Sequence, residues 1–162
     1  MSTGKGAPDL RVGIDLVRVS EVGASVGRFG TRYVERIFTD HELECCRTGR
    51  GVDRSPSFEA SLAARFAAKE AALKVLRPVG PRPAWRDLEV RRDGAGRTGL
   101  RLSGRAAVLA ERAGLESLTV HLTHQEPLSA AVAVGVCRAG GDPHDRSRTG
   151  TECPTRTGGG ER

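Results

Sequence analysis

Two carboxylates and a lysine stand out from their surroundings in the sequence. Asp15 interrupts the otherwise apolar segment VGIDLV, while Glu70 and Lys74 lie one helical turn apart in the segment KEAALK. On a helical wheel of about 100° per residue, Glu70 lies roughly 40° from Phe66, at the margin of an apolar stripe. A carboxylate at such a margin needs a partner, and an i,i+4 pair with Lys74 supplies one. In this interpretation Asp15 simply faces solvent from a half-exposed strand.

A second interpretation gives the same three residues a chemical function. If the strand with Asp15 packs against the helix with Glu70, the two carboxylates can hold one divalent cation. Mg²⁺ takes oxygen ligands, usually one or two carboxylates completed by substrate phosphate and water. A metal that neutralises charge and an ammonium, here Lys74, that steadies a phosphate oxygen form the minimum set for phosphoryl-type transfer. The residues alone leave both interpretations open.

Lysine is rare in this chain. Of 26 basic residues only three are lysine, namely Lys5, Lys69 and Lys74, and two of these lie within one hexapeptide. Chance is one explanation for this pairing. The other is that a compact ammonium, which places a point charge and loses its proton when desolvated, is required at that place.

A basic face is predicted in the first helical segment. Arg28, Arg32 and Arg36 recur at every fourth residue and therefore stack on one side of a helix, with Arg11 and Arg18 upstream. Such a face is a solvated surface, a dock for an acidic helix of a partner, or a contact for DNA phosphates.

The histidines are less informative. His124 shares the strand parity of the apolar residues before it and lies at the end of a predicted hairpin. It is either a polar turn residue or an imidazole that reaches a ligand. His41 is predicted on the surface of a helix's first turn, and His121, of opposite parity, on the surface of its strand.

The overall composition limits the class of protein. The chain has 162 residues, 38% hydrophobic and 28% charged, which favours one soluble domain without a membrane span. The net charge of +6 favours an anionic partner, whereas 4% aromatic residues argue against a stacking platform for nucleic acid. Met1 to Asp9 lack a signal-peptide pattern, and the four cysteines, Cys45, Cys46, Cys137 and Cys153, lack CxxC spacing. We therefore expect a cytoplasmic protein with reduced thiols.

The elements that must position these residues follow from hydrophobic periodicity. We expect a flexible leader over 1–9, a domain over 10–138 and a disordered tail over 139–162, which has no large apolar residue. Period-two patterns predict strands, helical periodicity predicts helices, and Thr39 to Glu42 has the spacing of a capping box. The elements expected are a strand at 12–17, helices at 20–38, from 39, and at 57–76, strands at 88–90 and 100–102, a helix at 104–114, and strands at 118–122 and 130–136. This order predicts an α+β domain with a mainly antiparallel sheet packed on a long helix.

Six segments in this order resemble one known family. They are VGIDLVRV (12–19), RIFTDHELE (36–44), SLAARFAAKEAALKVL (61–76), WRDLEVRRDGAGR (85–97), LSGRA (102–106) and VHLTHQE (120–126). Together they are similar to the holo-(acyl carrier protein) synthases, the short bacterial 4′-phosphopantetheinyl transferases. The resemblance covers residues 11–137.

The resemblance implies a reaction and a set of site residues. Members transfer the phosphopantetheine arm of coenzyme A to a serine of apo acyl carrier protein, release adenosine 3′,5′-bisphosphate, and serve fatty acid biosynthesis. Asp15 and Glu70 match the ligands of Mg²⁺, and Lys74 matches a catalytic lysine near the pyrophosphate. The resemblance also implies homotrimers with active sites between subunits. Arg65 and His124 match coenzyme-binding positions, and Arg28 and Arg32 match the basic helix that docks the carrier.

The chain departs from the family pattern in two places. After the long helix, a Gly-Thr-Gly type of loop is expected, but the chain has Arg77-Pro78-Val79-Gly80-Pro81, so that Arg77 or Arg82 would have to replace its substrate contacts. In the last hairpin, His121 and Leu128 stand where a serine and a tyrosine are usual.

Three other functions compete with carrier modification for fatty acid synthesis. The same chemistry can serve a specialised polyketide or peptide-synthetase carrier protein. A non-catalytic module that binds the carrier or coenzyme A would keep the fold without turnover. A nucleic-acid binder would account for the net charge, but the sequence has no known nucleic-acid-reading motif.

Overall fold

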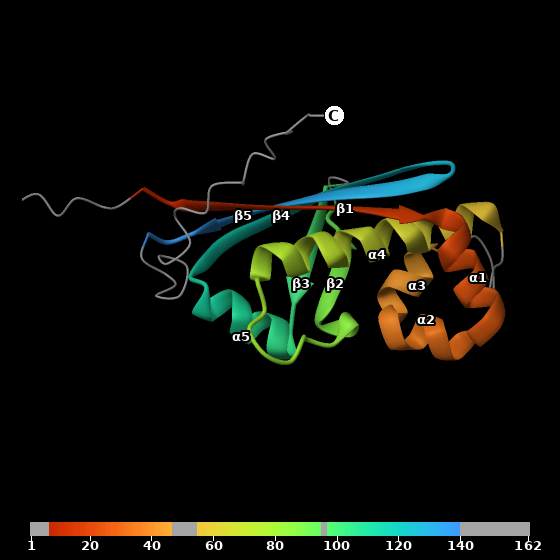
Figure 1. Cartoon of the computed structure of the whole chain (residues 1–162), viewed down its shortest axis with the longest axis horizontal. Helices are drawn as coiled ribbons and strands as arrows, with labels where there is room; N and C mark the ends of the chain where they lie inside the picture. Colours follow the sequence, from red (N-terminus) through yellow and green to blue (C-terminus); the bar gives the residue numbers. More distant parts are fainter. Residues whose placement is uncertain (1–6, 47–54, 95–96, 140–162) are drawn as a thin grey trace, which may run out of the picture.

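The computed structural model describes residues 7–46, 55–94 and 97–139, which form a single sheet with helices on one of its faces (Figure 1). The five strands are β1 (Asp9–Arg18), β2 (Leu88–Arg92), β3 (Thr98–Leu102), β4 (Leu115–Gln125) and β5 (Leu128–Cys137). Their order in the sheet is β1-β5-β4-β3-β2, and every neighbouring pair is antiparallel. The predicted α+β class with an antiparallel sheet is confirmed.

The helices are α1 (Val19–Phe29), α2 (Thr31–Ile37), α3 (Asp40–Cys46), α4 (Pro56–Leu76) and α5 (Gly104–Arg112), with a 3₁₀ turn η1 (Trp85–Asp87). The long helix α4 lies along β1, β5 and β4, with α1 to α3 at one end and α5 towards the other (Figure 1). None of the helices in the described ranges is long and apolar enough to cross a membrane.

The start and end of α4 follow from local chemistry. Ser55 accepts a hydrogen bond from the backbone N–H of Phe58 at 3.2 Å, and Pro56 occupies the first turn, where its missing N–H costs nothing. At the other end Arg77 adopts the left-handed conformation, with φ of 47°, and Pro78 prevents continuation. The predicted helix over 57–76 is therefore confirmed to within one residue.

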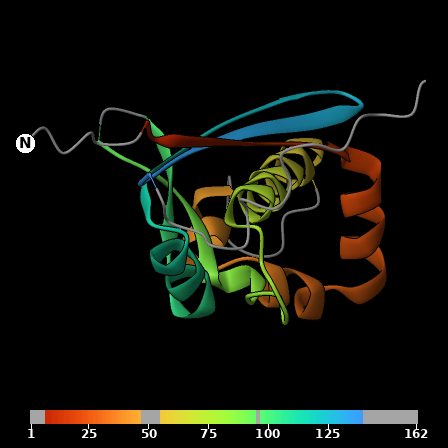
Figure 2. The ribbon, with the colours of Figure 1, turned by 60° about the vertical axis from the view of Figure 1, so that its left-hand side comes forward.

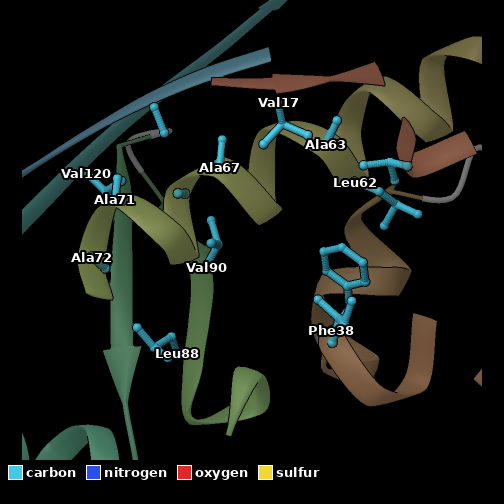
Figure 3. Close-up of a cluster of buried hydrophobic side chains, with 14 of the residues drawn as sticks. Val17, Phe38, Leu62, Ala63, Ala67, Ala71, Ala72, Leu88, Val90 and Val120 are labelled. Carbon is cyan, nitrogen blue, oxygen red and sulfur yellow. The ribbon is translucent and has the colours of Figure 1, made fainter. Parts of the chain in front are cut away.

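The core forms where the alanine-rich surface of α4 meets the sheet. Ala63, Ala67 and Ala71 are fully buried beneath the strands, and Phe38 fills the space at the end of the helix near Leu62 (Figure 3). Small side chains let the helix backbone approach the sheet closely, so that residues of β1 and α4 come within hydrogen-bonding reach. The helix is buried on more than the one stripe that periodicity indicated, because α1, α3 and β2 cover its other sides.

One close approach depends on Gly13. A Cβ atom on Gly13 would lie 2.0 Å from the carbonyl oxygen of Ala71 and 3.0 Å from the Cβ of Lys74. Both neighbours belong to a buried, hydrogen-bonded helix that cannot retreat without moving the core. Glycine at this position therefore sets the separation between β1 and α4.

We expect Gly13→Ala to lower the free energy of unfolding by about 1–3 kcal/mol, the usual range for overpacking. Urea unfolding at one fixed protein concentration measures this. Gly27→Ala is the matched control, because Gly27 lies in α1 with nothing near its Cβ position, and alanine there favours the helix. A Gly13→Ala variant as stable as the wild type would show that the helix does not constrain this position.

The helix predicted over 20–38 is two helices. Gly30, with φ of 58°, separates α1 from α2 and is the C-terminal cap of the first and the N-terminal cap of the second. Periodicity cannot show this break, because the apolar pattern continues on both sides of it. Arg28 therefore belongs to α1, whereas Arg32 and Arg36 belong to α2, although all three are exposed.

The capping box before α3 is confirmed, and its glutamate has a larger structural role. The Thr39 N–H donates to Glu42 Oε2 at 2.9 Å, and the Glu42 N–H donates to Thr39 Oγ1 at 3.3 Å. Glu42 is fully buried, and its other oxygen accepts from the Val90 N–H at 2.9 Å. One carboxylate thus joins α3 to β2.

Lys69 completes this buried cluster. Its Nζ donates to Glu42 Oε2 at 2.7 Å and to the carbonyls of Ile37 at 2.8 Å and Trp85 at 3.0 Å. Burial lowers the pKa of Lys69, and the charge of Glu42 opposes that effect. The ammonium therefore has three acceptors, and it holds α2, α3 and η1 against α4.

The face of the sheet opposite the helices carries an unusual apolar row. Leu10, Val12, Ile14 and Leu16 of β1 are 63, 54, 60 and 63% exposed. Val134 and Val132 of β5 lie beside Val12 and Ile14 and extend the row. In both views the described helices lie on the other side (Figures 1 and 2).

Of the predicted leader and the predicted tail, the structure describes only residues 7–9 and residue 139. β1 begins at Asp9, so the last residue of the predicted leader is part of the sheet. Arg11, predicted to lie on the basic surface, is instead 3% exposed and pairs with Asp9 at 2.9 Å. The predicted tail, apart from its first residue, lies outside the described ranges.

Candidate active site

The structure brings Asp15 and Lys74 together. Lys74 Nζ donates to Asp15 Oδ1 at 2.9 Å and to the carbonyl oxygen of Ile14. The two side chains come from β1 and α4 and are 59 residues apart in the sequence. Asp15 lies on the strand face that meets the helix, since the flanking residues of that face, Gly13 and Val17, are buried. The interpretation in which Asp15 merely faces solvent is wrong.

Glu70 lies one turn before Lys74, on the same side of α4. Its side chain is partly buried, and burial followed by the negative charge of Asp15 raises its pKa, against the opposing charges of Arg82 and Lys74. The two carboxylates are thus close enough to repel one another. Lys74, which contacts Asp15, is one cation that relieves this repulsion, and a further cation near both acids would relieve it more.

A pocket of about 820 Å³ opens beside these residues. Its polar lining is cationic except for one carboxylate. The lining consists of Glu70, Leu73, Lys74, Arg77, Pro78, Val79 and Arg82. A pocket with three cations and one acid suits an anionic ligand of more than one charge, such as a diphosphate.

The oxygen donors of Asp15 and Glu70 fit a magnesium ion only with help from other ligands. Within residues 7–46, 55–94 and 97–139, no group of three or more His, Cys, Asp or Glu residues is placed to hold a metal. Two interacting carboxylates nevertheless fit Mg²⁺ when substrate phosphate and water supply the other ligands. Asp15 and Glu70 therefore fit a substrate-assisted site and do not form a self-sufficient metal cage.

In the described part of the chain, neither Arg65 nor His124 lines this pocket. Arg65 lines a second pocket of about 330 Å³ together with Cys45, Ser61, Val90, Arg91, Arg92, Thr98 and Leu122. Its Nη1 donates to the carbonyl of Ser61 at 3.2 Å, whereas its buried Nε has no hydrogen-bond partner among the residues that the structure describes. His124 is exposed near the end of β4, opposite Ser129 of β5. Among the described residues the two pockets have no lining residue in common, so Arg65 and Glu70 line different pockets of one chain.

Comparison with known proteins decides the family. The chain matches the 4′-phosphopantetheinyl transferase superfamily over residues 11–136. A holo-(acyl carrier protein) synthase from Chloroflexus aurantiacus is 42% identical over 133 residues, which cover 75% of this chain and 94% of that protein. The chain belongs to the holo-(acyl carrier protein) synthases.

Solved structures of this family support the fold. A complex of the Chronobacterium ammoniagenes synthase with coenzyme A has a TM-score of 0.68 and 27% identity, covering 81% of this chain and 98% of that one. The acyl carrier protein synthase of Mycobacterium tuberculosis has a TM-score of 0.57 and 32% identity, covering 80% and 97%. The chain is therefore an enzyme of the 4′-phosphopantetheinyl transferase superfamily with the fold of its relatives.

The two lysines of the synthase motif KEAALK differ in role. Lys74 is exposed at the pocket, whereas Lys69 is fully buried in the cluster with Glu42. A helical wheel indicates that Lys69 lies on the apolar side of the helix, because it is roughly 300° from Phe66, between Phe58 and Leu62. The sequence indicates only a capping role for its partner Glu42, because no local pattern predicts a contact 27 residues away.

Proposed function

We propose that this chain transfers the 4′-phosphopantetheine group of coenzyme A to a serine of apo acyl carrier protein and releases adenosine 3′,5′-bisphosphate. The observation that carries the proposal is that Glu70 and Lys74 of α4 line one cationic pocket, while Asp15 of β1 pairs with Lys74 and its charge acts on Glu70. In this family a site of this kind fits the diphosphate of coenzyme A. We further propose a cytoplasmic location, which agrees with free thiols at Cys45, Cys46 and Cys137.

Asp15 and Glu70 are the residues that would hold Mg²⁺. When bound, the ion offsets charge on the diphosphate as the bond to the leaving phosphate breaks. Support comes from the mutual repulsion of the two carboxylates and from their position beside the pocket. Because Lys74 already contacts one oxygen of Asp15, the lysine also limits where a second cation can lie.

The chain's own residues can then bind, orient and move protons. Lys74 steadies a phosphate oxygen, so that the phosphorus attached to the pantetheine arm faces the incoming serine. The serine oxygen forms the new P–O bond, while the P–O bond to the nucleotide breaks and the electron pair leaves with adenosine 3′,5′-bisphosphate. The serine proton passes to Glu70 or to water at the pocket.

The proposal includes a homotrimer with each site completed by a neighbouring chain. The apolar row on β1 and β5 supports it, because each of its four β1 side chains is more than half exposed. It is also supported because, among the described residues, Arg65 lines a different pocket from Glu70 and His124 lines neither, so that a neighbour's residues can complete the coenzyme site.

We expect Val12→Glu to shift the protein to smaller species in sedimentation velocity, because it places a charge in the centre of the apolar row. Phosphopantetheine transfer should fall in parallel. Val108→Glu in α5 is the matched control, since Val108 is also exposed but lies outside the row. An unchanged sedimentation coefficient for Val12→Glu would argue against this interface.

Docking of the carrier is assigned to the exposed residues Arg28 and Arg32. They lie on the adjoining helices α1 and α2, and the guanidinium of Arg28 stacks 5.0 Å from the ring of Phe29. An acidic carrier helix would be attracted by this surface, and the attraction would weaken with salt.

The proposed function is tested by mass spectrometry of the carrier. Purified protein is incubated with coenzyme A, Mg²⁺ and apo acyl carrier protein, with EDTA in a parallel sample. The expected result is a gain of one phosphopantetheine mass without EDTA and none with it, and a KM for the carrier that rises with salt. Absence of the gain, under conditions where a known synthase modifies the same carrier, would refute the proposal. Rates on fatty-acid, polyketide and peptide-synthetase carriers identify the preferred class.

A further inference from the structure

The segment between α4 and η1 forms one side of the active-site pocket. Arg77, Pro78, Val79 and Arg82 line the pocket from this segment, and the other lining residues belong to α4. Its backbone includes two positive φ angles, 47° at Arg77 and 82° at Gly80. The sequence here replaces the glycine-rich loop expected of the family.

The replacement changes which groups can bind a phosphate. Glycine-rich loops hold phosphates through successive backbone N–H groups. Pro78, Pro81 and Pro83 have no backbone N–H, so three positions of residues 77–84 cannot donate in that way. A phosphate at this wall therefore needs side-chain donors, and arginine supplies several in a planar arrangement that matches phosphate oxygens.

A residue outside the pocket holds the segment in place. Arg105, in the first turn of α5, donates from Nε to the carbonyl of Pro81 at 2.6 Å and from Nη2 to that of Val79 at 3.4 Å. Asp87 Oδ2 accepts from the backbone N–H groups of Ala84 and Arg105, each at 3.2 Å. Both carbonyls that contact Arg105 lie within three residues of Arg82, so its backbone position depends on this anchor.

We propose that Arg82 binds the diphosphate of the coenzyme in place of a glycine-rich loop, and that Arg105 is a positioning residue that holds Arg82 at the pocket. The inference rests on the proposed function, because that function supplies the diphosphate. Arg82 acts with Lys74, which approaches the same pocket from α4. Arg105 touches no ligand and acts only through the carbonyls of the segment.

The role of Arg82 is tested by isothermal titration calorimetry, which measures how tightly phosphate-containing probes bind the full chain. The probes are coenzyme A, 3′-dephospho-coenzyme A and inorganic pyrophosphate, and the variants are Arg82→Ala, Arg105→Ala and their double variant. Arg82→Ala should weaken the binding of all three probes by a similar factor of about ten or more, because each probe contains the diphosphate. Arg82→Lys should restore part of the loss. Arg112→Ala, an exposed arginine at the other end of α5, should bind like the wild type.

The positioning role has its own measurement. Arg105→Ala should weaken probe binding in the wild-type background. In the Arg82→Ala background it should have little further effect, since the two residues act as one unit. Equal effects in both backgrounds would overturn the role of Arg105. If pyrophosphate and coenzyme A bind Arg82→Ala as tightly as they bind the wild type, the role of Arg82 is overturned.

Failure of this inference is distinguishable from failure of the proposed function. If the wild type modifies the carrier and Arg82→Ala binds every probe normally, only the inference is refuted. If the wild type binds pyrophosphate but neither binds coenzyme A nor modifies the carrier, the proposed function is refuted, and so is the assignment of Arg82 to the coenzyme.

Discussion

Glu70→Gln is expected to lower the rate of phosphopantetheine transfer by about 10²–10⁴-fold, the range found when a positioned acid or base is removed. The amide keeps the shape of the side chain but removes its charge and its capacity to accept the serine proton. It also removes one of the two carboxylates assigned to the cation beside Asp15. Transfer is measured as the initial rate of carrier modification at saturating coenzyme A.

The fold should survive this substitution, because the Glu70 side chain is only partly buried and its removal relieves repulsion from Asp15. Circular dichroism and urea unfolding should therefore match the wild type. Glu111→Gln is the matched control, since this exposed glutamate of α5 lies far along the chain from the pocket residues. Wild-type turnover by Glu70→Gln would remove Glu70 from the mechanism.

Lys69→Met is expected to lower the free energy of unfolding by about 3–5 kcal/mol, the usual cost of removing one partner from a buried ion pair. Methionine has a similar length but leaves the buried carboxylate of Glu42 without its cation and two carbonyls, of Ile37 and Trp85, without their donor. Urea unfolding at one protomer concentration measures the loss, because an oligomer's apparent stability depends on concentration.

The same hexapeptide provides the control. Lys74→Met should change stability by less than about 1 kcal/mol, because its pair with Asp15 is half-exposed and screened by solvent. It should nevertheless reduce transfer strongly. The double variant Glu42→Gln/Lys69→Met should be less destabilised than the sum of the single variants. Equal stability losses for the two lysine variants would contradict the assignment of one lysine to the core and the other to the site.

Much of the fold was predictable because its signals are local. Capping chemistry sets the start of α3 from Thr39 and Glu42, and the periodicity of residues 57–76 together with Pro78 sets α4. The break at Gly30 was not predictable from periodicity, because the hydrophobic pattern is uninterrupted there. Glycine inside a helical pattern is also common enough that its φ cannot be inferred.

The site was only partly predictable. The sequence marked Asp15, Glu70 and Lys74 as chemically unusual, but their proximity depends on how β1 lies against α4, which the missing Cβ of Gly13 sets. The partner of Lys69 and the anchoring of Pro81 by Arg105 are tertiary contacts between distant segments. The exposed apolar row on β1 shows the same limit, since alternation indicates two faces but not which of them the helix covers.

The most direct measurement of the central claim is Mn²⁺ binding in the presence of coenzyme A, followed by the electron paramagnetic resonance signal of the free ion. The account predicts that the wild type binds Mn²⁺ more tightly with coenzyme A than without it. Asp15→Asn and Glu70→Gln should each weaken that ternary binding by about tenfold or more. Ternary binding of wild-type strength in both variants would contradict a cation shared by these two carboxylates.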